Sequence, residues 1–391
     1  MQYSFDEATL RRGTNSLKWD VGENELPMWV ADMDFKAAPA VLQALQNKLN
    51  QGIFGYQTVP QQWYSAIIGW WKSRHNTIID KEWLCFCTGV IPAITSAVKR
   101  ITNVGDSVVV QTPVYDIFFH SIENTGRHVL ENKLAYKNGV YSFDFEDLAQ
   151  KLAMPNTTML ILCNPLNPAG KIPSAAELSK IGELCARHGV TVLSDEIHCD
   201  ITALGREYVP FMSVSKACAD ISVTCMAASK AFNLAGLQSA AVCVPNAALR
   251  NKIFRGLNSD EVAEPNAFAV DATIAAFTEG GEWLDALRGY LFKNRAYAQQ
   301  FISGALPEIQ AVKAEATYLL WLDCSKITDD AEKLCSFVRA YNGLYITAGN
   351  QYRGNGSKFV RINLACQRST LTDGLNRFAD GVRAYLLKER K

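Results

Sequence analysis

The sequence predicts an α/β fold, with a mostly parallel sheet in a large domain and a smaller α+β domain. Between about residues 46 and 285, short apolar segments alternate with helix-like segments, which is typical of a sheet covered on both faces. Several apolar segments lack polar alternation, as strands buried on both sides do. Seven segments are expected to form this one sheet: 84–88, 107–111, 127–134, 158–163, 190–194, 221–228 and 240–244.

The C-terminal part of the chain has a different pattern. A long helical segment over about 283–305 precedes three further expected strands, at 318–323, 344–348 and 359–364, and a last helix over 371–387. We therefore expect three regions: 1–45 as an N-terminal arm and part of the small domain, 46–285 as the large domain, and 286–391 as the small domain. Within the large domain, Ser174 and Glu177 have the spacing of a capping box that begins a helix.

The composition excludes several classes of protein. The 391 residues are 48% hydrophobic and 20% charged, which is typical of a globular protein large enough for two domains. Lys+Arg and Asp+Glu both number 39, so no net charge favours nucleic acid or an anionic membrane. No apolar segment approaches the roughly 20 residues of a membrane helix, and the N-terminus lacks the pattern of a secretion signal.

The eleven cysteines predict reduced thiols in a cytoplasmic protein. Their number is odd, and several lie inside apolar strand-like segments, which favours buried thiols over a disulfide framework. Cys85 and Cys87 are two residues apart, no CxxC occurs, and the five histidines show no HExxH spacing. We therefore expect no metal site.

Polar side chains follow three of the predicted strands. Lys230 comes after the apolar segment 221–229, Asp195 follows the strand at 190–194, and Asn167 lies in the proline turn after 158–163. Ligands of a parallel sheet bind outside the carboxyl ends of its strands. A lysine that forms a Schiff base and an aspartate that pairs with a pyridinium nitrogen are what pyridoxal phosphate (PLP) needs. Each residue alone also has a structural interpretation, as a surface lysine, a strand-end cap or a turn residue.

Further candidates occupy similar positions. Gly89 makes a turn before a helical stretch at 92–100, so the amides of Val90 and Ile91 are placed to bind an anion. Tyr115 follows the strand at 107–111 and either stacks on a cofactor ring or sits in the core. His198 either stacks near the ring or fills space.

The alternation of side chains along a strand predicts which way two more charged residues, Arg361 and Glu196, point. In the strand at 359–364, Arg361 lies on the opposite face from Val360 and Ile362, where it is either solvated or clamps a substrate carboxylate. The same alternation directs Glu196 away from the side that Asp195 faces, so we do not assign Glu196 to the site.

These residues together resemble fold-type I PLP enzymes of the class I/II aminotransferase superfamily, over nearly the whole chain. Within that superfamily the chain is similar to the MalY/PatB-type C–S lyases, also called cystathionine β-lyases. Five stretches carry this resemblance: Met28-Trp-Val-Ala-Asp-Met-Asp34-Phe35, Gly52-Ile-Phe-Gly-Tyr56, Thr112-Pro-Val-Tyr115-Asp-Ile-Phe, Ser194-Asp-Glu-Ile-His198 and Ser229-Lys-Ala-Phe-Asn233. The resemblance implies a large PLP domain, a split small domain and a homodimer with active sites at the subunit interface.

The resemblance also implies individual roles. Lys230 is the Schiff-base lysine, Asp195 the pyridinium partner, Asn167 the partner of the ring oxygen, Tyr115 the stacking ring and Arg361 the substrate-carboxylate ligand.

For the phosphate, the resemblance assigns the amides of Val90 and Ile91 and the Tyr56 side chain of the neighbouring subunit. The chain departs from its relatives at Ala227, where they commonly carry a phosphate-binding serine. This departure puts the affinity for PLP in question, and the available replacements are Ser229 and Thr88.

The activity that this resemblance implies is β-elimination from an L-amino acid with sulfur on Cβ, which yields a thiol, pyruvate and ammonia. Lys230 removes the α-proton, and the ring supported by Asp195 takes the electrons. An aminotransferase uses the same parts, and a PLP-binding regulatory partner protein is a third interpretation. The sequence leaves open which thiol conjugate is preferred, although Met33 and Tyr115 are expected in the pocket wall.

Overall fold

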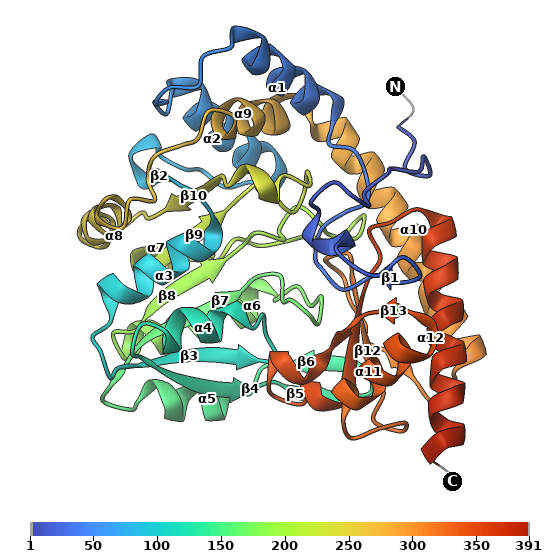
Figure 1. The fold of residues 1–391 in the computed structure, drawn as a ribbon. Coiled ribbons are helices and arrows are strands. Elements are labelled where there is room, and N and C mark those ends of the chain that lie inside the picture. Colours follow the sequence, from blue (N-terminus) through green and yellow to red (C-terminus); the bar gives the residue numbers. More distant parts are fainter. Residues whose placement is uncertain (1–2, 390–391) are drawn as a thin grey trace.

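The computed structural model describes residues 3–389 and contains the seven-stranded sheet that the sequence predicts (Figure 1). Each of the seven predicted segments supplies one strand. Only β10 runs antiparallel to its neighbours β2 and β9, and the other neighbouring strands are parallel. The order across the sheet is β2 (Leu84–Cys87), β10 (Ala240–Cys243), β9 (Ser222–Met226), β8 (Thr191–Asp195), β7 (Thr157–Cys163), β3 (Ser107–Thr112) and β4 (His128–Lys133).

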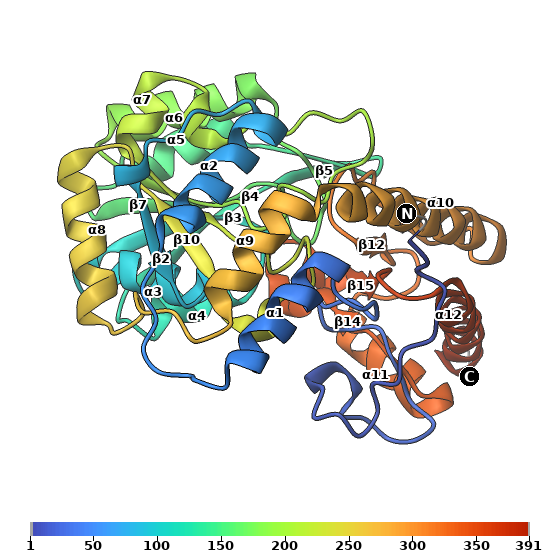
Figure 2. The same cartoon turned by 90° about the horizontal axis from the view of Figure 1, so that it is seen from above.

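Helices cover both faces of this sheet, as Figure 2 shows. One face packs against α3 (Val90–Ile101), α4 (Ile117–Glu123) and α8 (Ala247–Ser259). The other packs against α5 (Phe145–Leu152), α6 (Ala175–Arg187) and α7 (Lys216–Ile221). Six of the seven strands are almost wholly buried, which explains their apolar sequences, whereas the edge strand β4 is largely half-buried or exposed. Ser174 caps α6 through the predicted capping box with Glu177, which is confirmed.

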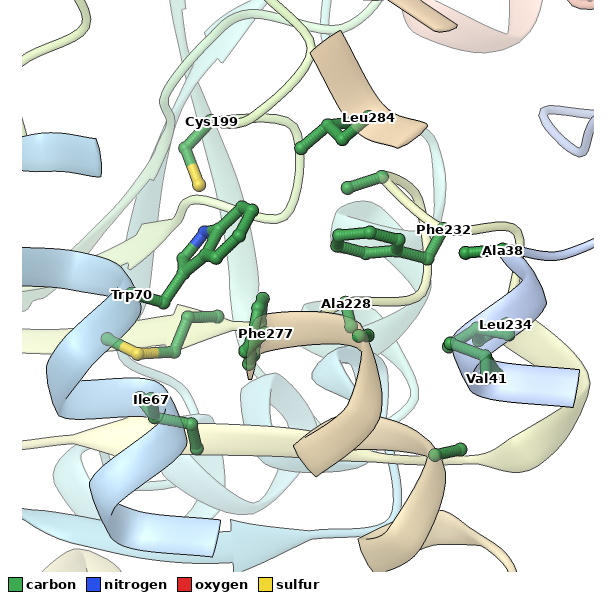
Figure 3. Packing of buried hydrophobic residues seen from close by; sticks show 14 of the residues in the cluster. Ala38, Val41, Ile67, Trp70, Cys199, Ala228, Phe232, Leu234, Phe277 and Leu284 are labelled. Atoms are coloured by element: carbon green, nitrogen blue, oxygen red, sulfur yellow. The ribbon is translucent and has the colours of Figure 1, made fainter. Parts of the chain in front are cut away.

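A third group of helices packs at the β2 end of the sheet. It consists of α1 (Pro39–Gln51), α2 (Gln61–His75) and α9 (Ala269–Glu279), and α9 contacts both of the others. Aromatic side chains fill the space between them: Trp70 packs against Phe277 and Phe232, with ring centroids 5.2 and 5.8 Å apart (Figure 3). This core fixes the end of α2 beside the turn that follows β8.

The small domain is built on a four-stranded antiparallel sheet. Its helices are α10 (Gly281–Ala305), α11 (Ala331–Asn342) and α12 (Arg368–Glu389). The predicted strand at 344–348 is divided in two, because the chain leaves one sheet and joins another at Ile346. The strands are β11 (Gln310–Ala311), β12 (Leu319–Asp323), β15 (Phe359–Asn363) and β14 (Thr347–Ala348), in that order.

The N-terminal segment lies against the small domain, where it is drawn in blue beside the red C-terminal elements (Figure 1). β1 (Leu26–Pro27) pairs in parallel with β13 (Leu344–Tyr345), far away in the sequence. A hairpin that was not predicted, β5 (Ala135–Lys137) with β6 (Val140–Ser142), follows β4. The start of α10 packs in the core of α1, α2 and α9, and its C-terminal half packs in the small-domain core. The exact domain boundary near residue 285 stays a prediction.

The cysteines and the helices can be compared with the sequence predictions on disulfides and membrane helices. All eleven cysteines are free thiols, and ten of them are buried. Within residues 3–389, none of the helices combines the length and apolar character needed to cross a lipid bilayer.

Candidate active site

A cavity of about 600 Å³ lies at the carboxyl ends of the central strands. It brings together side chains that are far apart in the sequence, from the large domain, the small domain and the N-terminal segment. The predicted site residues that line it are Gly89, Val90, Ile91, Tyr115, Asn167, Asp195, His198, Ser229, Lys230 and Arg361.

Lys230 lies in the loop after β9 and its amino group points to the N-terminal segment. Nζ donates a hydrogen bond to the backbone carbonyl of Ala31, at 2.8 Å, and the hydroxyl of Tyr318 donates to the same oxygen at 3.0 Å. Burial lowers the pKa of Lys230, and the nearby guanidinium of Arg361 lowers it further. The neutral amine, which is the form that acts as nucleophile and base, is therefore more populated here than in a solvated lysine.

Asp195 is the last residue of β8 and is buried with few partners. The backbone amide of Ile197 donates to Oδ1 at 3.2 Å. Burial raises the pKa of Asp195 to about 7, and the opposing effects of the Ile197 amide and the Lys230 charge are smaller. A buried carboxylate of this kind is stabilised by a cation placed against it, such as a protonated ring nitrogen.

Glu196 lies outside the cavity, as strand alternation predicts. Its carboxylate accepts hydrogen bonds from the backbone amide of Phe211 at 2.9 Å, from the Ser194 hydroxyl at 2.7 Å and from the Tyr208 hydroxyl. These donors satisfy a completely buried carboxyl group, so its role is in the packing of the large domain.

Arg361 and Asn167 meet on the small-domain side of the cavity. The guanidinium donates to the carbonyl of Trp29 at 2.7 Å and to Oδ1 of Asn167 at 3.4 Å, and it lies over the ring of Tyr352. Nε of Arg361 is buried with no partner among the described residues. Because Asn167 uses its oxygen for Arg361, its amide nitrogen stays available as a donor toward the cavity. Arg361 is thus held in place while retaining donors for a carboxylate.

His198 and Tyr115 contribute rings to the cavity. Burial lowers the pKa of His198 to about 3, so its imidazole is neutral, and Nδ1 has no partner among the described residues. The ring packs edge-on against Tyr318, at 6.2 Å between centroids. Burial raises the pKa of Tyr115 to about 12, so the phenol stays protonated near neutral pH. His198 is buried and Tyr115 is half-buried, and both line the cavity, as stacking on a flat ligand requires.

The start of α3 forms the opposite end of the cavity. The helix begins at Val90 directly after Gly89, so the first amides of the helix are free to bind an anion. Thr88 and Ser229 line the same cavity. Ala227, where the resemblance leads us to expect a phosphate-binding serine, is buried and does not line it.

Two predicted site residues lie outside the cavity of this chain. Met33 was expected in the pocket wall, but only 1% of its surface is exposed, and its side chain packs in the core with Phe35 and Trp63. This corrects the expectation: the backbone turns at residues 29–31, and those residues line the cavity in place of Met33. Tyr56 is 100% exposed, which leaves its assignment to a neighbouring subunit as a prediction.

Among the residues of this site that sequence reasoning missed, three hold Lys230 or Arg361 in place, namely Trp29, Ala31 and Tyr318. Trp29 and Ala31 act through backbone carbonyls, which every residue type carries, so no pattern singles them out. Tyr318 precedes β12 and reads as a core aromatic. The only available signal was that the segment 28–35 belongs to one of the stretches that carry the family resemblance.

The donor set of this cavity fits PLP. The amine of Lys230, whose pKa is lowered, matches the aldehyde, and the buried carboxylate of Asp195, which has no cationic partner among the described residues, matches the ring nitrogen. The free amides at the start of α3 match the phosphate, and the unpartnered Nε of Arg361 matches a substrate carboxylate.

Comparison with known proteins agrees with this geometry. The family model for aminotransferase class I and II matches residues 21–378. The chain is 45% identical over 380 residues to cystathionine beta-lyase PatB of Bacillus subtilis, covering 96% of this chain and 98% of that protein. It is 32% identical over 390 residues to protein MalY of Escherichia coli, covering 98% and 99%.

Solved structures give the same result. Cystalysin from Treponema denticola, which contains a PLP cofactor, superimposes with a TM-score of 0.95 at 31% identity, covering 98% of this chain and all of that one. The PLP-bound C–S lyase from Staphylococcus hominis gives a TM-score of 0.91 at 32% identity, with 98% of each chain covered. The predicted resemblance and fold are confirmed, and the chain belongs to the class I and II aminotransferase family.

Proposed function

We propose that the protein is a PLP-dependent C–S lyase, which cleaves L-cystathionine or a related L-cysteine S-conjugate into a thiol, pyruvate and ammonia. The observation that carries the proposal is the meeting of Lys230, Asp195, Asn167 and Arg361 in one cavity. The lyase relatives, which share 30% identity or more over nearly the whole chain, favour elimination over transamination.

In this proposal the cofactor would be held from both ends. Lys230 would bind it covalently, Asp195 would pair with its ring nitrogen and Asn167 would donate to its ring oxygen. The amides of Val90 and Ile91 at the start of α3 would hold the phosphate, with Thr88 and Ser229 lining the same cavity. When bound, PLP supplies an electron sink for negative charge at the substrate Cα.

The side chains of this chain carry the proton transfers and the orientation. Arg361 binds the substrate carboxylate, and its contacts with Trp29 and Asn167 keep the guanidinium in one orientation. Nζ of Lys230, once free, takes the proton from Cα, and its lowered pKa makes the neutral, basic form more populated than in a solvated lysine. Asp195 keeps negative charge against the ring nitrogen, and the neutral imidazole of His198 adds no charge that would compete with it.

We further propose that the protein acts as a cytoplasmic homodimer on a small amino acid. The fully exposed Tyr56 makes no use of its hydroxyl within its own subunit, which supports a role against the phosphate of a neighbouring subunit. Buried free thiols support a reducing compartment. The balanced charge gives no support to a nucleic-acid or membrane partner.

The experiment measures the products formed from L-cystathionine and L-cysteine by PLP-loaded protein, with and without 2-oxoglutarate. Equal amounts of pyruvate, ammonia and thiol without a keto acid are expected. Turnover that requires 2-oxoglutarate and accumulates glutamate would instead establish an aminotransferase and overturn the proposal.

A further inference from the structure

A second cavity, of about 480 Å³, shares no lining residue with the cofactor cavity. Three potential metal ligands face it. His75 is the last residue of α2, and Cys199 and Asp200 belong to the turn that follows β8. The packing of α2 beside this turn brings them together, and Figure 3 shows the sulfur of Cys199 directed toward Trp70 of the same helix.

The ligand atoms of these three residues lie within 4.8 Å of one another. Nε2 of His75 is 2.9 Å from Oδ1 of Asp200, and the indole nitrogen of Trp70 donates to the same oxygen at 3.0 Å. The side chains of His75 and Asp200 are 6% and 5% exposed, so both are held by packing at the cavity wall. Within residues 3–389, this is the one group of His, Cys, Asp or Glu ligands with such spacing.

Two carboxylates lie at this turn. Asp200 is itself one of the three ligands, and Glu196, three residues before Cys199, is completely buried and accepts a hydrogen bond from the hydroxyl of Tyr208, which lines the cavity. A bound cation would neutralise negative charge at this point and would deprotonate the thiol that coordinates it.

Three arginines also line the cavity, and each of them pairs with a carboxylate. Arg74 and Arg288 both pair with Asp285, at 2.7 and 3.2 Å, and Arg206 pairs with Glu315 at 3.3 Å. Arg288 also donates from Nε and from one Nη to the backbone carbonyl and the hydroxyl of Thr202, both at 2.9 Å, so its donors are taken up by partners other than the three ligands.

We propose that His75, Cys199 and Asp200 form a zinc-binding site on the cavity wall. One imidazole nitrogen, one sulfur and one carboxylate oxygen suit Zn²⁺, whereas Mg²⁺ and Ca²⁺ prefer oxygen ligands alone. The cavity leaves a fourth position for water. Binding forms a bond to Sγ in place of its S–H bond and releases that proton to solvent. His75 binds through the Nε2 lone pair, with its ring proton on Nδ1, and no oxidation state changes.

Such an ion would connect two parts of the large domain. It would fix the C-terminal end of α2 to the turn that follows β8. Asp195 at the end of β8 and His198 in this turn both line the cofactor cavity. Zinc should therefore stabilise the folded protein, because a ligand that binds only the folded state raises its free energy of unfolding. Ligand-spacing rules missed the group because His75 and Cys199 are far apart in the sequence and meet only through packing.

Zinc binding is tested on the full-length PLP-loaded protein, stripped of metal and titrated with ZnCl₂ in a calorimeter. We expect one ion to bind per subunit. Titrations in buffers of different ionisation enthalpy should show that about one proton is released per ion, because zinc replaces the proton of the Cys199 thiol. Cys199→Ser and His75→Gln should each weaken binding at least about tenfold, since each removes one of three ligands. Cys335→Ser is the matched control, because that thiol is equally buried but lies in the small domain.

X-ray absorption by the zinc provides a readout that does not depend on how the variants fold. One sulfur neighbour at about 2.3 Å together with nitrogen or oxygen neighbours at about 2.0–2.1 Å is expected. An ion without a sulfur neighbour, an affinity unchanged in both variants, or an absence of stoichiometric binding would each overturn the proposal. Zinc should also raise the melting temperature of the wild-type protein, whereas Mg²⁺ should not.

Discussion

The amino group of Lys230 donates to the backbone carbonyl of Ala31 across the cofactor cavity, with 2.8 Å between Nζ and the oxygen. The two residues are almost two hundred positions apart, and the contact joins the large domain to the N-terminal segment. Tyr318 fixes the same carbonyl from the small domain. The lysine is therefore held at the point where all three parts of the chain meet, which gives its amine one preferred position before reaction.

Replacing Lys230 with alanine is expected to lower the rate of pyruvate formation by more than about 10²-fold, because the variant loses both the covalent anchor and the base. Borohydride reduction followed by mass spectrometry should find PLP attached to the wild-type protein and not to the variant. Lys216→Ala is the control, since Lys216 is exposed and pairs only with Asp220 on its own helix. Near-normal turnover by Lys230→Ala would contradict the assignment.

Asp195→Asn should change stability in a pH-dependent way in the cofactor-free protein. Burial raises the pKa of Asp195 from 3.8 to about 7 in the folded state. The folded state therefore holds this proton more tightly than the unfolded state, and the stability that this contributes is lost as pH rises from about 4 through 7. At pH 8 the asparagine variant, which has no charge to bury, should be more stable than wild type.

The size of that gain is on the order of a few kcal/mol, since one pKa unit corresponds to about 1.4 kcal/mol. Melting temperatures of both cofactor-free proteins at pH 4 and pH 8 would measure it, and the difference should vanish at the lower pH. With PLP present the order should reverse, because the variant cannot pair with a protonated ring nitrogen. A variant less stable than wild type at pH 8 without cofactor would contradict the burial argument.

The sequence predicts the central sheet and much of the site because both depend on strand ends. Apolar segments that are buried on two faces are easily recognised, and the first polar residues after them, Asp195 and Lys230, must lie at the carboxyl edge. Arg361 follows from the alternation of β15 in the same way. These predictions need only the chain's local periodicity.

What the sequence does not predict depends on irregular backbone and on packing between distant segments. Ala31 acts through a backbone carbonyl, and Met33, two residues later, lies in the core. Neither could be predicted, because the segment between β1 and α1 has no regular period. β1 and β13 are too short to have a pattern, and they pair only because the N-terminal segment lies against the small domain.

Arg361→Lys should impair substrate binding more than folding. Lysine keeps the charge but loses the planar pair of donors, and it cannot reach Trp29 and Asn167 together as the guanidinium does. We expect kcat/KM to fall by about 10²-fold, mostly through KM, which corresponds to about 2.7 kcal/mol of charge-assisted hydrogen bonding. PLP affinity should be retained. Arg353→Lys is the control: Arg353 pairs with Glu123 at the surface, so this variant should change neither kcat/KM nor the affinity for PLP. An unchanged KM in Arg361→Lys would show that Arg361 does not bind the substrate carboxylate.

Tyr56→Phe tests the dimer and the phosphate site together. The side chain is 100% exposed in the single subunit, so loss of its hydroxyl should leave the melting temperature of the cofactor-free protein unchanged. If the hydroxyl donates to the phosphate bound by a neighbouring subunit, the Kd for PLP should rise about tenfold, because a hydrogen bond to a charged group contributes about 1.5–3 kcal/mol. Fluorescence titration with PLP would measure this, with Tyr341→Phe as an exposed control. If Tyr56→Phe sediments as a dimer and its Kd for PLP is unchanged, Tyr56 does not reach the phosphate. A wild-type protein that is monomeric and still binds PLP would also exclude a phosphate site shared between subunits.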